Sequence, residues 1–293
     1  MIIKKSLGEK VFDTFNYVFL IFLMIITIYP VVYVVLASLS DSNQLMAHSG
    51  ILLKTLGFNT DAYSAVLANP NIISGYGVTI FTVLVGTFLN VFFTSIGAFI
   101  LSRKNYPFNK ILTVMILFTM YFSGGMIPRY LFINDTLNMG NSIWALLLPG
   151  LISTYNLIVM RTNFQSIPDS LEESAKIDGA NDIVILFRII LPLSKAIIAV
   201  MVLMYGVSRW NAWFDAMLFI RDRGLYPLQI ILREILISNS TDSMISGSAG
   251  DVEAIGESIK YATIVVSTAP ILCVYPFIQK YFTKGVMIGA VKG

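Results

Sequence analysis

Long apolar runs divide the chain into six candidate helices, and only the fifth contains charged residues, Arg209 and Asp215. A bilayer core about 30 Å thick is crossed by about 20 helical residues, each rising 1.5 Å. Runs of about this length lie at residues 14–40, 78–101, 111–127, 143–160, 196–220 and 261–279. None alternates with the two-residue period of a barrel strand, and unpaired backbone is not tolerated in lipid. The pattern therefore predicts an all-α membrane protein with six transmembrane helices.

The basic residues between these runs orient the chain in the membrane. Lys and Arg that flank a span in a short loop are retained on the cytoplasmic side. With the N-terminus inside, thirteen of the 20 Lys and Arg fall in cytoplasmic segments, six fall outside and Arg209 lies within a span. Both termini are therefore predicted to be cytoplasmic. The first run has 27 uncharged residues, which favours a retained helix over a signal peptide, whose core has about 7–15.

The composition agrees with a membrane protein and excludes other classes. Apolar residues make up 56% and charged residues 13%, against about 45–50% and about 25% in soluble domains. The mean hydropathy is +0.76. The chain has a single Cys, Cys273, and a single His, His48, so it has no set of Cys and His ligands for a metal. Catalysis by a Cys–His pair is not expected, because Cys273 lies inside the sixth run and His48 lies outside the runs. The net charge of +3 gives no reason to expect nucleic acid as a partner.

The segment between the fourth and fifth runs, 161–195, has the pattern of two short cytoplasmic helices. Ser170 and Glu173 have the spacing of a capping box, which predicts that the first helix begins there. Gly179 predicts its end, because glycine adopts the positive φ that closes a helix. Asn181 or Asp182 can begin a second helix that runs toward Pro192.

One face of the first short helix is suited to docking. Its members have the three- and four-residue spacing of helix neighbours and are mostly small: Leu171, Ser174, Ala175 and Asp178. Such a face can enter a groove of another protein and move with the spans as one body. A helix lying on lipid headgroups is the alternative. The five acids and one base between residues 169 and 182 argue against an anionic surface.

The same segment resembles a known family. Its spacing runs Glu173-Ser174-Ala175, three residues, Gly179, nine residues, Ile189, one residue, and Leu191-Pro192. This is similar to the EAA loop of permease subunits in bacterial ABC importers. Ser174 departs from the alanine that is common in the family, with a small change in volume. The tail 284–293 resembles the end of MalG-type sugar permeases, and residues 210–214 and 226–229 are similar to permeases for complex oligosaccharides.

The resemblance implies a fold and a mechanism. The fold is that of a type I ABC importer permease: one transmembrane domain over 1–293, with a coupling loop at 161–195 and a cytoplasmic tail at 280–293. Such a subunit, in the bacterial cytoplasmic membrane, forms half of a pathway for an oligosaccharide or polysaccharide fragment. It pairs with a second permease, binds two cytoplasmic ATPases through the loop and receives substrate from an external binding protein.

The chain is therefore expected to be a transporter subunit rather than an enzyme. No Gly-Lys pair occurs for a phosphate loop, so ATP and Mg are expected on the partner ATPases and no cofactor on this chain. The residues implied in ATPase coupling are Leu171, Glu172, Glu173, Ser174, Ala175, Asp178, Gly179 and Pro192. The residues implied at the ATPase interface from the tail are Gly289, Lys292 and Gly293.

The fifth run carries the candidate substrate residues. An Arg within a span costs on the order of 2.5–3.5 kcal/mol to insert, so such a residue is a candidate for a functional or structural role. Polar groups bond sugar hydroxyls, and indoles stack on sugar rings. The candidates are Ser208, Arg209, Trp210, Asn211, Trp213 and Asp215. Of these, Ser208, Asn211 and Asp215 would form a polar stripe. The alternative is that the Trp residues form an aromatic belt while Asn211 and Asp215 hold neighbouring helices together.

Two rival functions remain open at this level. An ion-driven secondary carrier would need charges deep in several spans or broken helices in matching halves, and only the fifth run carries interior charge. An ABC permease for a non-sugar solute is the other. The sequence does not name the carbohydrate or its charge.

Overall fold

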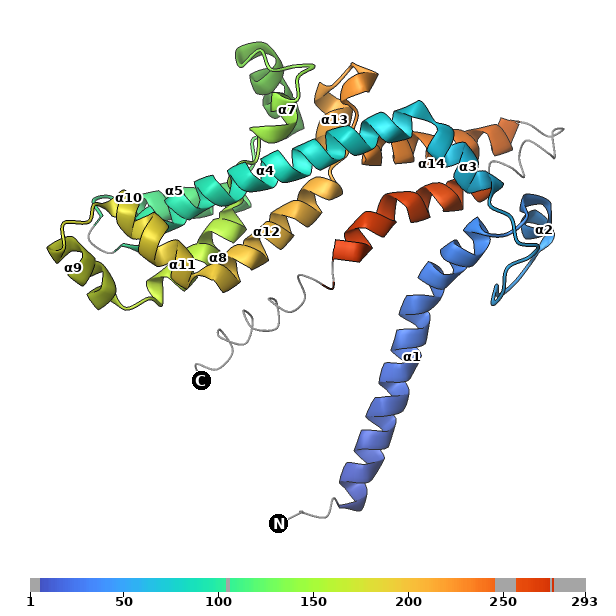
Figure 1. Cartoon of the computed structure of the whole chain (residues 1–293), viewed down its shortest axis with the longest axis horizontal. Helices are drawn as coiled ribbons and strands as arrows, with labels where there is room; N and C mark the ends of the chain where they lie inside the picture. The colour runs from blue at the N-terminus through green and yellow to red at the C-terminus, as the bar shows by residue number, and fades with distance from the viewer. Residues whose placement is uncertain (1–5, 104–105, 246–256, 275, 277–293) are drawn as a thin grey trace. The chain divides into compact units, whose positions relative to one another are not determined.

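The computed structural model describes residues 6–103, 106–245, 257–274 and 276, which are mainly helical (Figure 1). No strand occurs among these residues, only one isolated bridge between Ser40 and Phe58. The chain forms two compact units. The first contains residues 1–69 and 232–268, and the second contains residues 70–231 and 269–293. The all-α class predicted from the sequence is confirmed.

The first unit is built around α1 (Leu7–Ser38), a helix of 32 residues. A capping box starts it, because Glu9 N donates to Ser6 Oγ at 3.2 Å and Ser6 N donates to Glu9 Oε2 at 2.8 Å. Most of its apolar side chains are exposed, as expected of a helix that meets lipid. The short helices α2 (Ser42–Ala47) and α3 (Asp61–Ala68) follow. α1 covers the first predicted span, 14–40, except for its last two residues.

The second unit is built around α4 (Pro70–Ser102), a helix of 33 residues. Its buried positions are largely small or polar, including Thr79, Asn90, Thr94 and Ala98. Small residues allow close approach, and α4 packs along α8 (Thr154–Gln165) and α12 (Lys195–Trp210). Figure 1 shows these three helices side by side. The predicted second span, 78–101, is confirmed within α4.

The third predicted span is interrupted. α5 (Asn109–Tyr121) ends at its C-cap, Phe122, and the chain turns by 114° into α6 (Met126–Leu131) and the π-helix η1 (Phe132–Thr136). Gly125 permits the turn with a φ of 86°. The helix expected over 111–127 therefore ends at Tyr121, and helix resumes at Met126.

The fourth predicted span is also broken. The short helix α7 (Trp144–Leu147) ends after four residues, and helix resumes at α8, with Ser153 Oγ accepting from Asn156 N at 3.4 Å. Residues 148–153 between them are not helical, and Gly150 has a φ of 89°. One continuous helix over 143–160 was wrong.

The fifth predicted span contains two helices. α12 ends at Trp210, and α13 (Phe214–Phe219) begins after three non-helical residues. Before α12, the chain forms α9 (Asp169–Ile177), α10 (Asp182–Ile185), the π-helix η2 (Leu186–Ile190) and α11 (Leu191–Leu193). The bend between 182–193 and α12 is 87°.

The end of the described chain contains η3 (Arg223–Leu225), α14 (Leu228–Ile245) and a last helix, Glu257–Val274. Among the described residues, three helices are long and apolar enough to cross a membrane, or five if each bent pair counts as one span. Six spans are therefore not established by helix length alone.

Candidate functional site

The first helix of the loop between α8 and α12, α9, begins two residues earlier than the sequence predicts, because its N-cap is Pro168 and not Ser170. Pro168 has a φ of −58° and a ψ of 130°, and no side chain caps the helix. Ser170 therefore lies inside the first turn, where its hydroxyl does not take the capping position. The capping box of Ser170 and Glu173 was wrong, because the fixed φ of proline sets the start of the helix.

The end of α9 is as predicted. Gly179 has a φ of 84°, and Ala180 N donates to the carbonyl oxygen of Ala175 at 2.9 Å. These bonds close the last turn. The side chain of Asn181 then caps the next helix by accepting from Val184 N at 2.9 Å.

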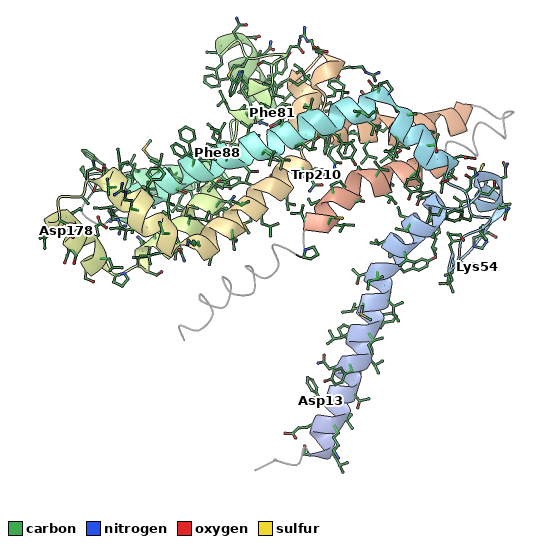
Figure 2. All side chains as sticks on the ribbon, in the orientation of Figure 1. Asp13, Lys54, Phe81, Phe88, Asp178 and Trp210 are labelled. Carbon is green, nitrogen blue, oxygen red and sulfur yellow. The ribbon has the colours of Figure 1, made fainter. Side chains whose placement is uncertain are left out.

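The predicted coupling residues of α9 lie on two faces of the helix, one buried and one exposed. Ala175 and Glu172 are buried, with 8% of each residue exposed, whereas Leu171 is 44% exposed. Glu173, Ser174, Asp178 and Gly179 are exposed as well. Ile177, which the sequence reasoning missed, is 87% exposed. Figure 2 shows Asp178 at one end of the second unit, on the loop between α8 and α12. Exposed apolar groups on this helix suit a protein partner.

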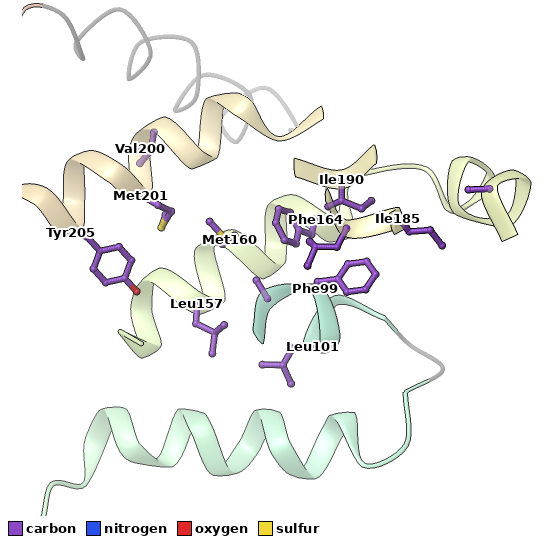
Figure 3. Close-up of a cluster of buried hydrophobic side chains, with 13 residues drawn as sticks. Phe99, Leu101, Leu157, Met160, Phe164, Ile185, Ile190, Val200, Met201 and Tyr205 are labelled. Atoms are coloured by element: carbon purple, nitrogen blue, oxygen red, sulfur yellow. The ribbon is translucent and has the colours of Figure 1, made fainter. Parts of the chain in front are cut away.

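A continuous apolar core supports this end of the second unit. Figure 3 shows Phe99, Phe164, Ile185 and Ile190 close together, and Ala175 of α9 belongs to the same cluster. Phe164 and Ile185 have no exposed surface. The predicted Pro192 lies in α11, at the bend into α12, where a helix tolerates proline because its first turn has no bond to lose.

A charged pair, not predicted from the sequence, joins α9 to the end of α4. Arg103 Nη1 lies 2.9 Å from Glu172 Oε2, and the two side chains are 13% and 11% exposed. A polar pocket of about 340 Å³ lies beside them, also lined by Tyr106 and Gln165. The sequence shows Arg103 among the basic residues that follow the second run. It does not indicate that Arg103 pairs with Glu172.

The half-buried Arg209 donates its hydrogen bonds to protein groups. Its Nε donates to Asn90 Oδ1 at 3.1 Å, Nη2 donates to the carbonyl oxygen of Leu147 at 2.9 Å, and Nη1 donates to that of Leu146. The two carbonyls lie where α7 ends, so they have lost their helical partners. Arg209 thus supplies hydrogen bonds at the break in the fourth predicted span.

Asn90 completes the same arrangement. Its Nδ2 donates to the carbonyl oxygens of Gly150 at 2.9 Å and Leu151 at 2.7 Å, and the residue has no exposed surface. One turn earlier on α4, a Cβ on Gly86 would lie 3.0 Å from Arg209 Nε. Gly86, Asn90 and Arg209 together form what we call the carbonyl clamp, which holds the end of α7 and the first non-helical residues after it, 146–151 in all.

The remaining substrate candidates do not form the predicted stripe. Ser208 lies on α12, whereas Asn211 follows the end of that helix and Asp215 belongs to α13. A stripe on one helix was wrong because the helix stops at Trp210. Asp215 accepts from Arg129 Nη2 at 2.8 Å, and Asn211 Nδ2 donates to the carbonyl oxygen of Val207 at 2.9 Å.

The two indoles have aromatic neighbours. Trp210 is 8% exposed and lies 6.4 Å from the ring of Tyr76, and Trp213 contacts Phe214 edge to face. A groove of about 700 Å³ between α4 and α12 is lined almost entirely by apolar groups, including Phe88 and Trp210 (Figure 2). Such a surface offers few bonds to a sugar hydroxyl. The predicted tail residues Gly289, Lys292 and Gly293 lie outside the described residues.

The chain is similar along nearly its whole length to two proteins of Bacillus subtilis strain 168. It is 40% identical over 292 residues to the polygalacturonan/rhamnogalacturonan transport system permease protein YtcP, covering 97% of this chain and 99% of that protein. It is 40% identical over 284 residues to the protein LplC, covering 97% and 96%. No protein-family model matches the chain.

A solved structure agrees with these relatives. A chain from a bacterial ABC transporter involved in the import of the acidic polysaccharide alginate matches with a TM-score of 0.85 and 30% identity, covering 95% of this chain and 99% of that one. The helices and the comparisons together define a multi-pass protein of the cytoplasmic membrane. The chain belongs to the family of ABC transporter permeases that these carbohydrate-transport proteins represent, and it is a transporter subunit rather than an enzyme.

Proposed function

We propose that the chain forms half of the translocation pathway of an ATP-driven importer for an oligosaccharide or polysaccharide fragment. Its relatives support the carbohydrate class, since they are named for polygalacturonan and rhamnogalacturonan transport and for alginate import. A further relative, 26% identical, is named for arabinooligosaccharides. Polygalacturonan, rhamnogalacturonan and alginate contain uronic acids, so we favour fragments of an acidic polysaccharide as the substrate. Neutral oligosaccharides are the alternative substrate class.

The observation that carries the proposal is the geometry of α9. The helix is held from behind by Ala175 and Glu172 and presents Leu171, Ser174 and Ile177 outward. A short helix with one anchored face and one exposed, partly apolar face fits a groove in a partner. Glu173 and Asp178 on the exposed side add charge that can pair with basic groups. We propose that this face docks on a cytoplasmic ATPase subunit and receives the work of ATP binding and hydrolysis.

The other components follow from the same proposal. A second permease completes the pathway, two ATPases carry ATP and Mg, and an extracytoplasmic binding protein delivers the substrate. Both termini lie in the cytoplasm, and the tail residues Gly289, Lys292 and Gly293 reach the ATPase interface. The substrate passes near α12, α13 and the segment between them, where Trp213 and Asn211 offer an indole and an amide.

The test is uptake by the reconstituted complex. The chain, its partner permease, the ATPases and the binding protein are placed in liposomes and given labelled galacturonan fragments, alginate fragments or arabinooligosaccharides. Uptake is expected with ATP and unchanged when ion gradients are collapsed by an ionophore. Uptake driven by an ion gradient without ATP would overturn the proposal in favour of a secondary carrier. ATP-driven uptake of none of the three carbohydrates would reject the substrate class and leave a non-sugar solute.

A further inference from the structure

We propose that Arg103 and Glu172 are positioning residues that join the coupling helix α9 to the cytoplasmic end of α4, so that both helices move as one body. The inference rests on the proposed function and adds the element that carries the movement from α9 into the membrane. We call this ion pair the α4–α9 link. Arg103 is the first residue after α4, and Glu172 lies in the first half of α9.

The apolar contacts of α9 are too few to fix its orientation alone. Of its nine residues, only Glu172 and Ala175 are buried. Ala175 is small and contributes a single methyl group to the apolar cluster beneath it. A helix held by one methyl contact can tilt or slide. The second buried side chain, Glu172, therefore determines how the helix is held.

The pair has the geometry and burial of a strong link. Arg103 Nη1 and Glu172 Oε2 lie 2.9 Å apart, and neither side chain is more than 13% exposed. The guanidinium also lies 4.7 Å from the centre of the Phe99 ring, one turn back on α4. Such burial reduces screening by water and salt. The bond is therefore both directional and persistent.

Arg103 depends on Glu172 for compensation. Its Nε and Nη2 are buried and make no hydrogen bond in the part of the chain that the structure describes. Removing one member of a buried pair leaves the other charge uncompensated, which disfavours the docked arrangement. Loss of the Glu172 charge therefore favours release of Arg103 toward water and a loosened α9.

The α4 side of the link is rigid. Asn109 Nδ2 donates to the carbonyl oxygens of Leu101 at 3.1 Å and Arg103 at 2.6 Å, and Arg161 Nε donates to that of Leu101 at 2.8 Å. These bonds satisfy carbonyls that the end of α4 leaves free. Since α4 packs along α8 and α12, displacement of α9 through Glu172 acts on the central helix of the unit.

The neighbouring Lys176 provides a contrast within the same cluster. Its Nζ lies 3.0 Å from Glu172 Oε1 and 3.9 Å from Asp182 Oδ1, but its side chain is 54% exposed. Exposed pairs contribute little because water screens them. The cluster thus contains one buried pair that crosses from α9 to α4 and exposed pairs that stay within the loop.

The experiment compares variants in the complete reconstituted importer, with labelled galacturonan fragments as the probe, or whichever carbohydrate the unmodified importer takes up. Glu172→Gln and Arg103→Gln remove the charges, and Lys176→Gln is the matched control. The expected result is that ATPase co-purification is retained while the substrate taken up per ATP hydrolysed falls about tenfold in both variants. Lys176→Gln should change this ratio less than twofold, in keeping with an exposed pair.

The double variant Arg103→Glu with Glu172→Arg tests the pair itself. Because it restores opposite charges across the same gap, it should recover much of the lost ratio, which general damage to the fold would not allow. An unchanged ratio in both single variants would overturn the link. The link would also be overturned if the double variant, present in the membrane in normal amount, took up no more substrate per ATP hydrolysed than the single variants.

A second measurement covers variants that accumulate poorly or lose activity entirely. Spin labels on Ser170→Cys in α9 and Tyr121→Cys in α5, in a Cys273→Ser background, report the position of α9. The distance distribution should be narrow in the parent and broader in the Glu172→Gln variant. An equally narrow distribution in both would overturn the link. If the unmodified importer shows no ATP-driven uptake, the proposed function fails instead, and the distances still decide whether the pair holds α9.

Discussion

At the scale of single residues, Arg209 shows how a charge is accommodated inside an apolar bundle. The guanidinium bonds to Asn90 Oδ1 and to the carbonyl oxygens of Leu146 and Leu147. A broken helix in the membrane needs donors for its carbonyls, and a side chain from a neighbouring helix can supply them. The insertion cost of the Arg is therefore offset by the backbone groups that it satisfies. This contact accounts for the residue without a substrate.

Replacing Arg209 is predicted to destabilise the chain. Arg209→Leu leaves the carbonyls of Leu146 and Leu147 without their donors, at a cost on the order of 1–3 kcal/mol for each buried group. Arg209→Lys keeps a donor and should lose less. Thermal unfolding in detergent, followed by size-exclusion chromatography, measures both variants. Arg221→Leu, on the exposed segment after α13, is the control and should melt like the parent. Equal melting of Arg209→Leu and Arg221→Leu would contradict the carbonyl clamp.

Two glycines of α4, Gly86 and Gly77, provide a matched pair of variants that tests the carbonyl clamp. A Cβ on Gly86 would lie 3.0 Å from Arg209 Nε and 3.2 Å from Leu147 Cδ2, whereas a Cβ on Gly77 would meet nothing within 4 Å. Gly86→Ala is therefore predicted to destabilise by about 1–3 kcal/mol through overpacking. Gly77→Ala is predicted to stabilise by up to about 1 kcal/mol, because alanine favours helix. The melting temperatures should move in opposite directions, and movement in the same direction would contradict the close approach.

At the scale of elements, local signals predicted the loop better than the spans. Gly179 and Asn181 act through bonds within a few residues of themselves, so their roles at the end of α9 and the start of α10 were readable from the sequence. The start of α9 was misjudged by two residues because Pro168, and not Ser170, occupies the N-cap position. Boundaries that differ by about one or two residues are usual at helix ends.

The interrupted spans were not predictable in the same way. Segments 111–127, 143–160 and 196–220 are mostly apolar, yet each contains a break. Whether a helix continues depends on donors and acceptors supplied from elsewhere, as Asn90 of α4 does for Gly150. The hydrophobic pattern indicates only whether a segment lies in lipid, in a protein core or in water, and not whether its helix is continuous. The α4–α9 link was hidden for the same reason, because its two residues are far apart in the sequence.

The turn after α9 is predicted to be essential for uptake. Gly179 has a φ of 84°, and a β-branched residue there is strained by roughly 1–2 kcal/mol. Gly179→Val should therefore displace α10 relative to α9 and reduce uptake per assembled complex at least about fivefold. Uptake in liposomes and co-purification of the ATPase measure the effect. Gly124→Ala, at a glycine with open space around it, is the control. Normal uptake with Gly179→Val would show that the turn is incidental.

At the scale of the whole molecule, the comparisons establish more than the helix lengths do. Three helices, or five with the bent pairs, qualify as spans among the described residues. The match to the alginate importer chain, at a TM-score of 0.85 over 95% of this chain, supplies the fold that length alone leaves open. Interrupted spans are expected of transporters, where irregular backbone lies against protein or a water-filled cavity.

The orientation of the chain is predicted from its basic residues and can be measured directly. Ser170→Cys on α9 should react with a membrane-impermeant thiol reagent only in inside-out vesicles, and Ser49→Cys, between the first two long helices, only in right-side-out vesicles. The background is Cys273→Ser, and permeabilised vesicles, in which both sites should react, are the control. The opposite labelling pattern would place the N-terminus outside and contradict the charge rule.

The carbonyl clamp has a consequence for cargo selection. Because Arg209 directs its guanidinium at backbone oxygens of its own subunit, these N–H donors are already occupied before any cargo binds. In the importer that we propose, discrimination between acidic and neutral cargo then falls to the second permease and to the external binding protein. A hybrid importer that keeps this chain but exchanges those two proteins is thereby expected to adopt the preference of the donors.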